Sequence, residues 1–297
     1  MKKGILLVLA TAIISGFSIF INQFGVSVIN PYVFTGLKNI VVALFICCLL
    51  LAMKDWRFLK SLSKKYWLLL VAIGLIGGSI PFLLFFKGLS LTTAVQGSFI
   101  HKTMFIYVMV FAILFLKERI NKKLIFGSLL LLLGNAFLLK FIPHSLGTGD
   151  LLILLATLFW AIESVVSKHV LRELPARVVA WGRMFFGSIF ILAFLAGSGQ
   201  LFLIGILKIS QISWVAITSV FLFGYVITWY AGLKHVPVSV ATSILLLGAP
   251  ITTLLTFIYS GAISLMQIVG IVFALFGILI ICLKRSFKHH KEIYVRT

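Results

Sequence analysis

Acidic residues are scarce in this chain: only six Asp and Glu occur among 297 residues, and all charged residues together make up 11%. Hydrophobic residues make up 62% of the sequence. A soluble domain of this length cannot bury so much apolar surface, so the composition excludes a water-soluble protein. We therefore predict an integral membrane protein.

Patterns typical of disulfide-bonded, metal-binding and enzymatic proteins are also missing. Cys47, Cys48 and Cys282 lie in apolar runs, with neither disulfide nor metal-site spacing. Proteolysis or acyl transfer needs paired carboxylates, clustered histidines or a nucleophile with its base, whereas the apolar segments hold one carboxylate, Glu163, and one histidine, His101. No Walker-type glycine loop occurs. We predict no enzymatic activity, no cofactor and no metal site.

What the chain does contain is ten apolar segments of membrane-spanning length. They cover about 4–23, 32–53, 66–86, 92–116, 123–141, 150–168, 177–196, 212–232, 238–260 and 264–283. The first follows Met1-Lys2-Lys3 and imitates a secretory signal peptide, but it continues through Ile21 and has a repeat partner near Trp160. The sequence therefore predicts an all-α membrane protein with ten transmembrane helices.

The chain is internally duplicated with an offset of about 144 residues. The matching positions are Pro31 with Pro175, Gly88-Leu89 with Gly232-Leu233, and, with one residue of slip, Gly127 and Gly134 with Gly270 and Gly277. Five spans per copy is an odd number, so the second copy enters the bilayer from the opposite side. Such inverted repeats are common in secondary transporters. The predicted organisation is a repeat at 1–142, a second at 149–284 and a basic cytoplasmic tail at 285–297.

The distribution of basic residues predicts the orientation of the chain. Most of the 26 Lys and Arg lie in connectors on the same side as the N-terminus, which places both termini in the cytoplasm by the positive-inside rule. The formal net charge of +20 is then an orientation signal that also suits anionic lipid headgroups. We predict a multi-pass protein of the cell membrane (an inner or plasma membrane) that binds no nucleic acid.

Several short motifs occur in a characteristic order along the duplicated chain. They are the stretch 114–119 (LFLKER) at the end of the fourth span, Gly127 and Gly134 in the fifth, and 247–250 (LGAP) in the ninth. In this order the chain resembles the EamA-like family of the drug/metabolite transporter superfamily. The resemblance implies alternating access around a central site made mainly by spans 1, 3, 4, 6, 8 and 9. The second half departs from the first because Gly261 stands where the first half has Glu118.

Four charged residues fall within the predicted spans, where each charge costs at least ~2.5–3.5 kcal/mol on insertion scales. Lys102 is the deepest, and it either anchors an anionic substrate group or belongs to an internal ion pair. Lys38 and Arg183 occupy near-equivalent repeat positions within reach of an interface, so they either gate the substrate path or bind helix ends. Glu163 either couples transport to protons or pairs with Arg183 in the next span.

Polar and aromatic residues around these charges complete the candidate substrate site. His101 and Gln96 lie near Lys102 in the sequence, and each is interpreted as a cavity residue or a helix-to-helix hydrogen-bonding group. The deeper aromatic residues, interpreted as pocket walls or core, are Trp160, Tyr107 and Tyr225. Trp229 is expected in the aromatic belt at a span end. Glu118 is expected to accept hydrogen bonds from neighbouring bases and to cap the next helix.

The combined prediction is a secondary transporter that exports a small metabolite, an amino acid or related carboxylate, by alternating access. The alternative is a translocase for a lipid-linked phosphate or sugar-lipid, which needs a cation-lined groove open sideways to lipid. Glycine seams on the fifth and tenth spans indicate either packing within the chain or a homodimer contact.

Overall fold

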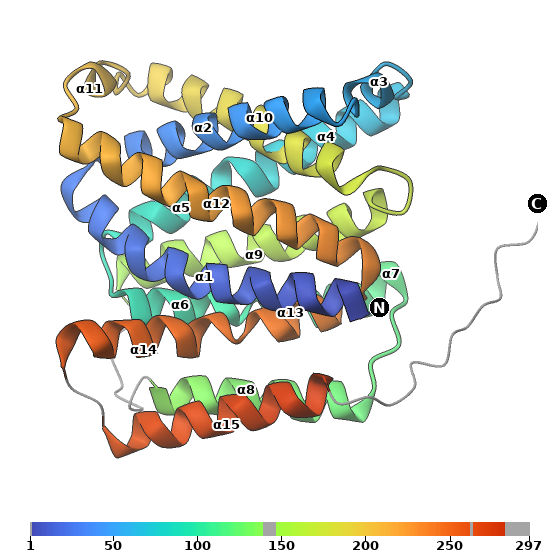
Figure 1. The fold of residues 1–297 in the computed structure, drawn as a ribbon, viewed down its shortest axis with the longest axis vertical. Helices are drawn as coiled ribbons and strands as arrows, with labels where there is room; N and C mark the ends of the chain where they lie inside the picture. The colour runs from blue at the N-terminus through green and yellow to red at the C-terminus, as the bar shows by residue number, and fades with distance from the viewer. Residues whose placement is uncertain (1, 139–146, 262–263, 283–297) are drawn as a thin grey trace, which may run out of the picture.

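The fold is described by a computed structural model covering residues 2–138, 147–261 and 264–282. All regular structure in these ranges is helical (Figure 1). The predicted basic tail at 285–297 lies outside the described residues. The first seven long helices are α1 (Lys2–Val28), α2 (Pro31–Ala52), α4 (Lys64–Gly78), α5 (Ile80–Leu89), α6 (Ala94–Lys102), α7 (Met104–Leu116) and α8 (Lys122–Leu138).

The second half of the chain follows with a similar series of helices. They are α9 (Thr148–Val170), α10 (Ala176–Gly197), α12 (Ile209–His235), α13 (Val238–Leu245), α14 (Gly248–Ser260) and α15 (Leu265–Cys282). Two short surface helices, α3 (Trp56–Leu59) and α11 (Phe202–Gly205), lie in connectors. Within the described ranges, eight helical segments are long and apolar enough to cross a bilayer, and α8 and α15 are shorter apolar helices. The chain is therefore a multi-pass membrane protein.

Three of the eight segments are interrupted near their middle. The breaks fall at Ser79 between α4 and α5, at Thr103 between α6 and α7, and at 246–247 between α13 and α14. The first break has a local cause: Pro81 has no backbone N–H, so it cannot bond the carbonyl four residues earlier, which belongs to Gly77. In a bilayer such a freed carbonyl needs a donor from elsewhere in the protein. It receives two, both from side chains of the central site.

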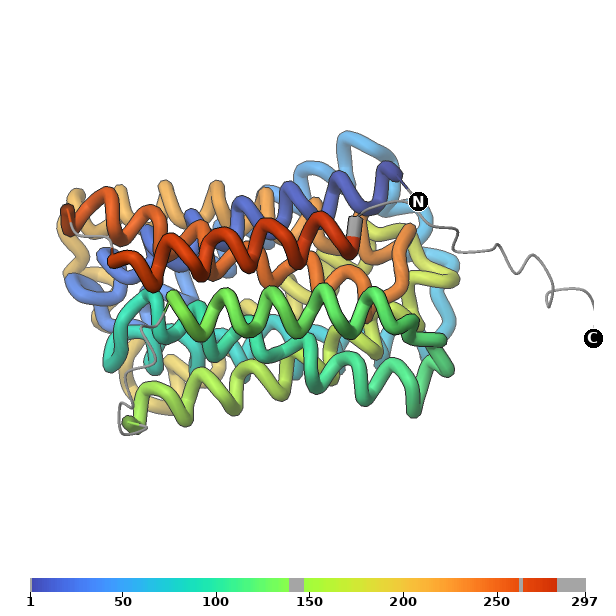
Figure 2. The backbone as a smooth tube through the Cα atoms, turned by 90° about the horizontal axis from the view of Figure 1, so that it is seen from below, coloured from blue at the N-terminus to red at the C-terminus, as the bar shows by residue number. Residues whose placement is uncertain are grey.

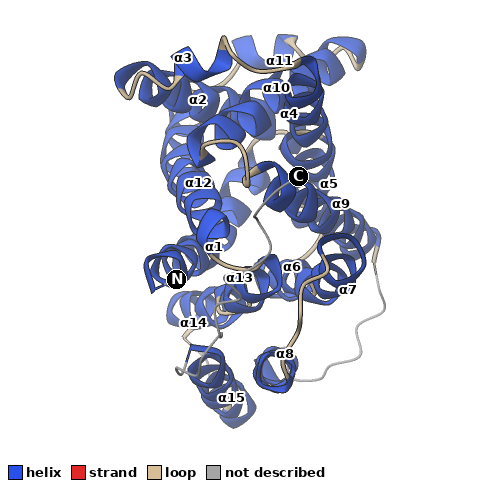
Figure 3. Ribbon diagram, turned by 90° about the vertical axis from the view of Figure 1, so that its right-hand side faces the viewer, coloured by secondary structure: helices blue, strands red, loops and turns tan. Residues whose placement is uncertain are grey.

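Helices α8 and α15 pack side by side at one end of the bundle (Figures 2 and 3). A Cβ atom added at Gly134 would lie 2.6 Å from the Gly270 carbonyl oxygen, and one at Gly127 would lie 2.9 Å from that of Gly277. The backbones meet this closely only because these positions carry no side chain. The glycine seams thus serve packing within the chain.

Replacing Gly134 by valine is expected to destabilise the fold by about 1–3 kcal/mol, because the added side chain meets backbone atoms of α15. Thermal unfolding in detergent measures this loss. Gly197→Val is the control, since no atom lies within 4 Å of a Cβ built there. A Gly134→Val protein with unchanged stability but altered oligomeric state in light scattering would instead assign the seam to a dimer.

Candidate functional site

A small cavity lies at the centre of the bundle, between helices of both halves of the chain. Its volume of about 50 Å³ has room for a few water molecules. The lining side chains come from seven helices and combine cations, hydroxyl groups and aromatic rings. They are Ser15, Ser18, Ile19, Asn22, Lys38, Phe82, Phe85, Phe86, His101, Trp160, Arg183, Leu222 and Tyr225.

Lys38 points into this cavity from α2 and is 1% exposed. Its ammonium donates to Asn22 Oδ1 and lies 4.1 Å from the ring centroid of Phe86 and 4.8 Å from that of Phe34. No carboxylate lies within 4 Å of the Lys38 ammonium among the described residues. The whole Lys38 side chain is enclosed within the protein, so it does not extend to a membrane interface as a snorkelling lysine would. It presents an ammonium with neutral partners only.

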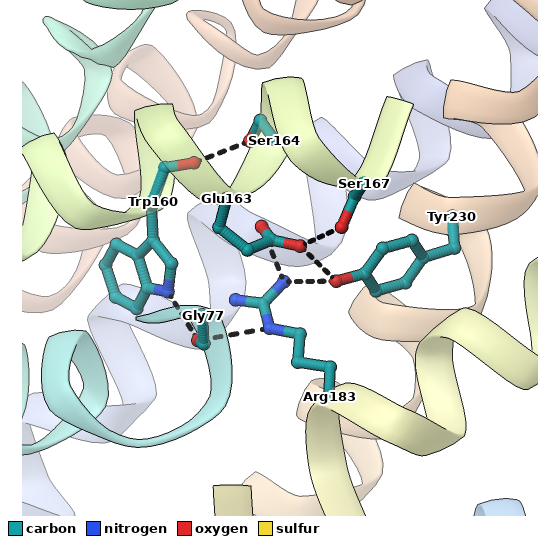
Figure 4. A network of polar contacts seen from close by, with 7 residues as sticks. All are labelled: Gly77, Trp160, Glu163, Ser164, Ser167, Arg183 and Tyr230. Atoms are coloured by element: carbon teal, nitrogen blue, oxygen red, sulfur yellow. Dashed lines mark hydrogen bonds and ion pairs between the residues drawn. The ribbon is translucent and has the colours of Figure 1, made fainter. Parts of the chain in front are cut away.

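Arg183 reaches the same cavity from α10 and is tied to a polar network (Figure 4). Its Nη1 lies 3.7 Å from Glu163 Oε2 and 3.4 Å from the Tyr230 hydroxyl, while Nε donates to the freed carbonyl of Gly77 at 3.2 Å. Like Lys38, Arg183 is buried, at 3% exposure, so its guanidinium does not extend to a membrane interface either. The pairing with Glu163 considered from the sequence is present.

Glu163 is held from three sides in this network. The hydroxyls of Tyr230 and Ser167 both donate to its Oε1, and Arg183 faces its other oxygen (Figure 4). The carboxylate is 1% exposed and lines a second cavity of about 10 Å³ that shares lining residues with the first. Both oxygens of this buried carboxylate therefore have polar partners within the protein.

Lys102 lies directly behind the cavity wall and is not among the lining residues. Its Nζ is 2.7 Å from Ser15 Oγ and 3.5 Å from His101 Nδ1, and both of those residues do line the cavity. At 2% exposure it contacts no lipid or solvent to any extent. Lys102 is the last residue of α6, next to the break at Thr103, and its side chain packs against Gly248, the first residue of α14. Lys102 therefore influences the cavity through Ser15 and His101.

Aromatic rings form much of the cavity wall next to His101. The Trp160 ring lies 4.9 Å from His101 and 5.3 Å from Phe85, centroid to centroid, and its Nε1 donates to Gly77 O at 2.9 Å. Tyr225 lines the cavity and stacks on Trp229 at 6.4 Å. Trp229 itself is 1% exposed, so its expected place in an aromatic belt is wrong.

Two sequence candidates lie away from the cavity. Tyr107 is a half-buried residue of α7 that packs against the apolar core, and Gln96 is a half-buried residue in the first turn of α6. Neither is among the residues lining the central cavity. Sequence reasoning missed Ser15 and Phe85, for which hydropathy gives no signal. It also missed the Gly77 carbonyl as a hydrogen-bond acceptor in the site, although Pro81, four residues later and without a backbone N–H, predicts that this carbonyl has no partner within its helix.

Glu118 binds a different helix from the one expected. Its carboxylate accepts from the backbone N–H groups of Val238 and Ser239 at 2.8 and 3.2 Å and from the Ser239 hydroxyl at 2.6 Å. It therefore caps α13 of the second half, and the expectation that it caps the following helix is wrong. The reason lies in Pro237, which precedes α13 and has no side-chain donor or acceptor to cap it.

Comparison with known proteins gives matches over nearly the whole chain. The sequence profile of the EamA-like transporter family matches residues 2–140 and again 147–283. An uncharacterized transporter from Archaeoglobus fulgidus is 26% identical over 96% of this chain and 100% of its own length. Another, from Methanothermobacter thermautotrophicus, is 24% identical over 57% of this chain, and the match spans about half (54%) of that relative.

A solved crystal structure shares the fold described above. It superposes with a TM-score of 0.74 over 93% of this chain and 96% of its own length, at 19% sequence identity. At this identity the likeness concerns the arrangement of helices alone.

Proposed function

This chain belongs to the EamA-like transporter family, and from that premise we propose that it exports a small anionic metabolite, an amino acid or related carboxylate, by alternating access. The relatives named as transporters support membrane transport as the general activity. The substrate class is argued from the central cavity.

The surplus of cations around the central cavity carries the proposal. Lys38, Lys102 and Arg183 are all buried there, and Glu163 is the one carboxylate beside them among the described residues. Glu163 already faces Arg183, which leaves two lysines with neutral partners only. Burying an ion without a partner costs several kcal/mol, so such a site favours a ligand that supplies the missing negative charge.

Lys38 is the residue we assign to the first contact with the substrate anion. Its ammonium lines the cavity directly, whereas that of Lys102 lies one side chain behind the wall. His101, Trp160 and Tyr225 then contact the rest of the substrate. We also propose that Arg183 gates the substrate path and that Glu163 couples transport to protons. Transport measured with and without a proton gradient tests the coupling.

The pattern of helix contacts supports two inverted repeats of five helices, at 1–142 and 149–284. In the first half, α1 is equivalent to α9 of the second, α4 and α5 to α12, and α6 and α7 to α13 and α14. Helix α1 contacts α12, α13 and α14, and its equivalent α9 contacts α4, α5, α6 and α7 in the same way. Helices α8 with α15, and α2 with α10, pair with their own repeat equivalents. Rocking of such halves around a fixed site gives alternating access. We place both termini in the cytoplasm and the protein in the cell membrane.

The lipid-linked alternative requires a cation-lined groove open to lipid. Lys102 is instead buried inside the bundle, and the residues that line the central cavity come from seven helices of both halves. This placement favours a water-soluble substrate.

Efflux from preloaded proteoliposomes tests the proposal. Amino acids, other carboxylates and uncharged sugars are loaded in turn, with matched and opposed pH gradients across the membrane. We expect faster efflux than from protein-free vesicles only for carboxylate-bearing compounds. No acceleration of any compound would contradict transport of this class. Equal efflux rates at all pH gradients would show that Glu163 does not couple transport to protons.

The Glu118 cap is expected to hold the cytoplasmic end of the cavity closed. Thr93, about 144 residues before Pro237, caps α6 with its own side chain, but α13 depends on Glu118 from the other half. Loss of a cap costs about 1 kcal/mol, a roughly fivefold shift in a two-state equilibrium. Glu118→Ala should therefore favour the state that is open to the cytoplasm.

Labelling of a cavity cysteine measures this shift. In a protein lacking the native cysteines, Ser164→Cys faces the smaller cavity, and an impermeant maleimide is applied from the cytoplasmic side. We expect labelling about fivefold faster with Glu118→Ala. Glu173→Ala, an exposed carboxylate at the same end of the bundle, is the control. Equal labelling in both variants would show that Glu118 acts only within the loop.

A further inference from the structure

A hollow much larger than the central cavity lies on the outer surface of the bundle, between α4, α7 and α9. It has a volume of about 490 Å³ and is lined by seven apolar side chains and one polar residue, His169. Phe115 and Ile162, two of the lining residues, are 72% and 43% exposed, so the hollow is an open groove on the lipid-facing side. It shares no lining residue with the central cavity. We call it the α7–α9 groove.

The α7–α9 groove has a basic rim at one end. Helix α4 begins there, while α7 and α9 end there (Figure 1). Lys65 precedes the lining residue Leu69 by about one helical turn, and Lys117 directly follows the lining residue Leu116. Lys117 adopts a left-handed conformation with φ of 54°, which ends α7 at this point. Arg172 follows His169 by three residues. Lys65, Lys117 and Arg172 are exposed.

Three carboxylates near this end leave the rim with a surplus of cations. Glu118 is adjacent to Lys117, but both of its oxygens are bound to the N-terminus of α13. Asp55 is paired with Arg177. Glu173 directly follows Arg172 and is exposed, so it offsets one of the three cations Lys65, Lys117 and Arg172. The rim therefore keeps a net positive charge.

The physics of a bilayer decides what such a groove can select. Lipid tails are as apolar as the groove wall, so covering the wall gives no preference for one lipid over another. A basic side chain near the membrane surface attracts an anionic lipid by about 1 kcal/mol, which is a factor of about five in affinity. The basic rim can therefore select among lipids by the charge of their headgroups, whereas the apolar groove can only position an acyl chain.

We propose that the α7–α9 groove is a binding site for an anionic phospholipid, with one acyl chain along the groove and its phosphate at Lys117, Arg172 and His169. This lipid is a bound ligand outside the transport path, since groove and central cavity share no residue. The inference does not depend on the proposed substrate. It concerns a different site on the same helix, α9, that carries Trp160 and Glu163 on its inner face.

Native mass spectrometry of the full-length protein in detergent tests the site, with phosphatidylglycerol and phosphatidylcholine of identical chains as probes. We expect the wild type to retain phosphatidylglycerol preferentially. The double variant Lys117→Gln/Arg172→Gln should lose about 25-fold of that preference, about fivefold for each charge. The control Lys60→Gln/Lys208→Gln removes the same net charge away from the groove and should keep the preference. Equal loss in both doubles, or no preference in the wild type, would overturn the proposal.

A variant of the groove itself separates a seated lipid from a loosely held headgroup. Val166→Trp places a large ring in the groove, at a half-buried position on the lipid-facing side where folding tolerates bulk. We expect it to release the retained phosphatidylglycerol while its thermal unfolding, measured in parallel, stays that of the wild type. A folded Val166→Trp protein that still retains phosphatidylglycerol would show that the groove holds no acyl chain.

Discussion

Replacing Lys38 by methionine is expected to lower the transport rate of the carboxylate substrate on the order of a hundredfold. Methionine fills the same space between Phe34 and Phe86 but supplies no charge to the cavity. Truncating one member of a buried charged pair costs about 2–5 kcal/mol, and in the proposed mechanism the other member is the substrate. The measurement is initial efflux from proteoliposomes containing equal amounts of folded protein.

Asn22→Asp is the matched variant for this prediction. It has nearly the same shape and keeps an oxygen on the Lys38 ammonium, but it supplies a counter-ion and replaces the Nδ2 group that donates to the Ser18 carbonyl at 2.6 Å. We expect it to be as inactive as Lys38→Met, and thermal unfolding measured in parallel reports the cost of the lost donor. Lys102→Met should have a smaller effect, because Lys102 contacts the cavity only through Ser15 and His101. Normal transport by Lys38→Met would assign the anion to another residue.

The second large effect is expected on stability, at the Glu163–Arg183 pair. Removing one partner of a buried pair leaves the other uncompensated and costs about 3–5 kcal/mol. Arg183→Met should reach this range, because it also leaves the freed Gly77 carbonyl with Trp160 as its one remaining donor (Figure 4). Thermal or denaturant unfolding in detergent, followed by loss of helical signal, measures the change.

The double variant Glu163→Gln/Arg183→Met provides the control for this pair. If the two side chains stabilise each other, the double variant loses less stability than the sum of the single variants. Tyr230→Phe removes the hydrogen bond to Glu163 and the 3.4 Å contact with Arg183 but no charge, and it should cost only about 1–2 kcal/mol, so it stays folded even where the charge variants do not. Additive losses would show that Glu163 and Arg183 act independently.

Of the ten membrane-spanning segments predicted from the sequence, eight have this length in the described residues, and their agreement follows from a physical limit that the bilayer imposes. Backbone polar groups in lipid must be satisfied within the helix, so a membrane segment appears as one continuous apolar run. The family resemblance rested on short motifs in a fixed order, and the chain belongs to that family. The interruptions at Thr103 and at 246–247 were not predicted, since the hydropathy there is unbroken.

Most residue types of the candidate site were predicted from the sequence, but the positions of their side chains relative to the cavity were predicted less well. Counting residues along each span places Lys38 and Arg183 toward opposite surfaces, whereas both side chains line the same cavity. Counting also made Lys102 the first candidate for the substrate, because it does not show which helix face meets the cavity. Glu118 and its true partner, Val238, lie 120 residues apart, a distance that local capping rules do not cover.

The central claim is that the cavity selects a negative charge, and one comparison of two substrates tests it most directly. Efflux of an active carboxylate and of its isosteric amide is measured in proteoliposomes with the wild type and with Asn22→Asp. The account predicts a wild-type rate for the carboxylate at least about tenfold above that for the amide, and the loss of this ratio in Asn22→Asp. Equal wild-type rates for acid and amide would contradict it.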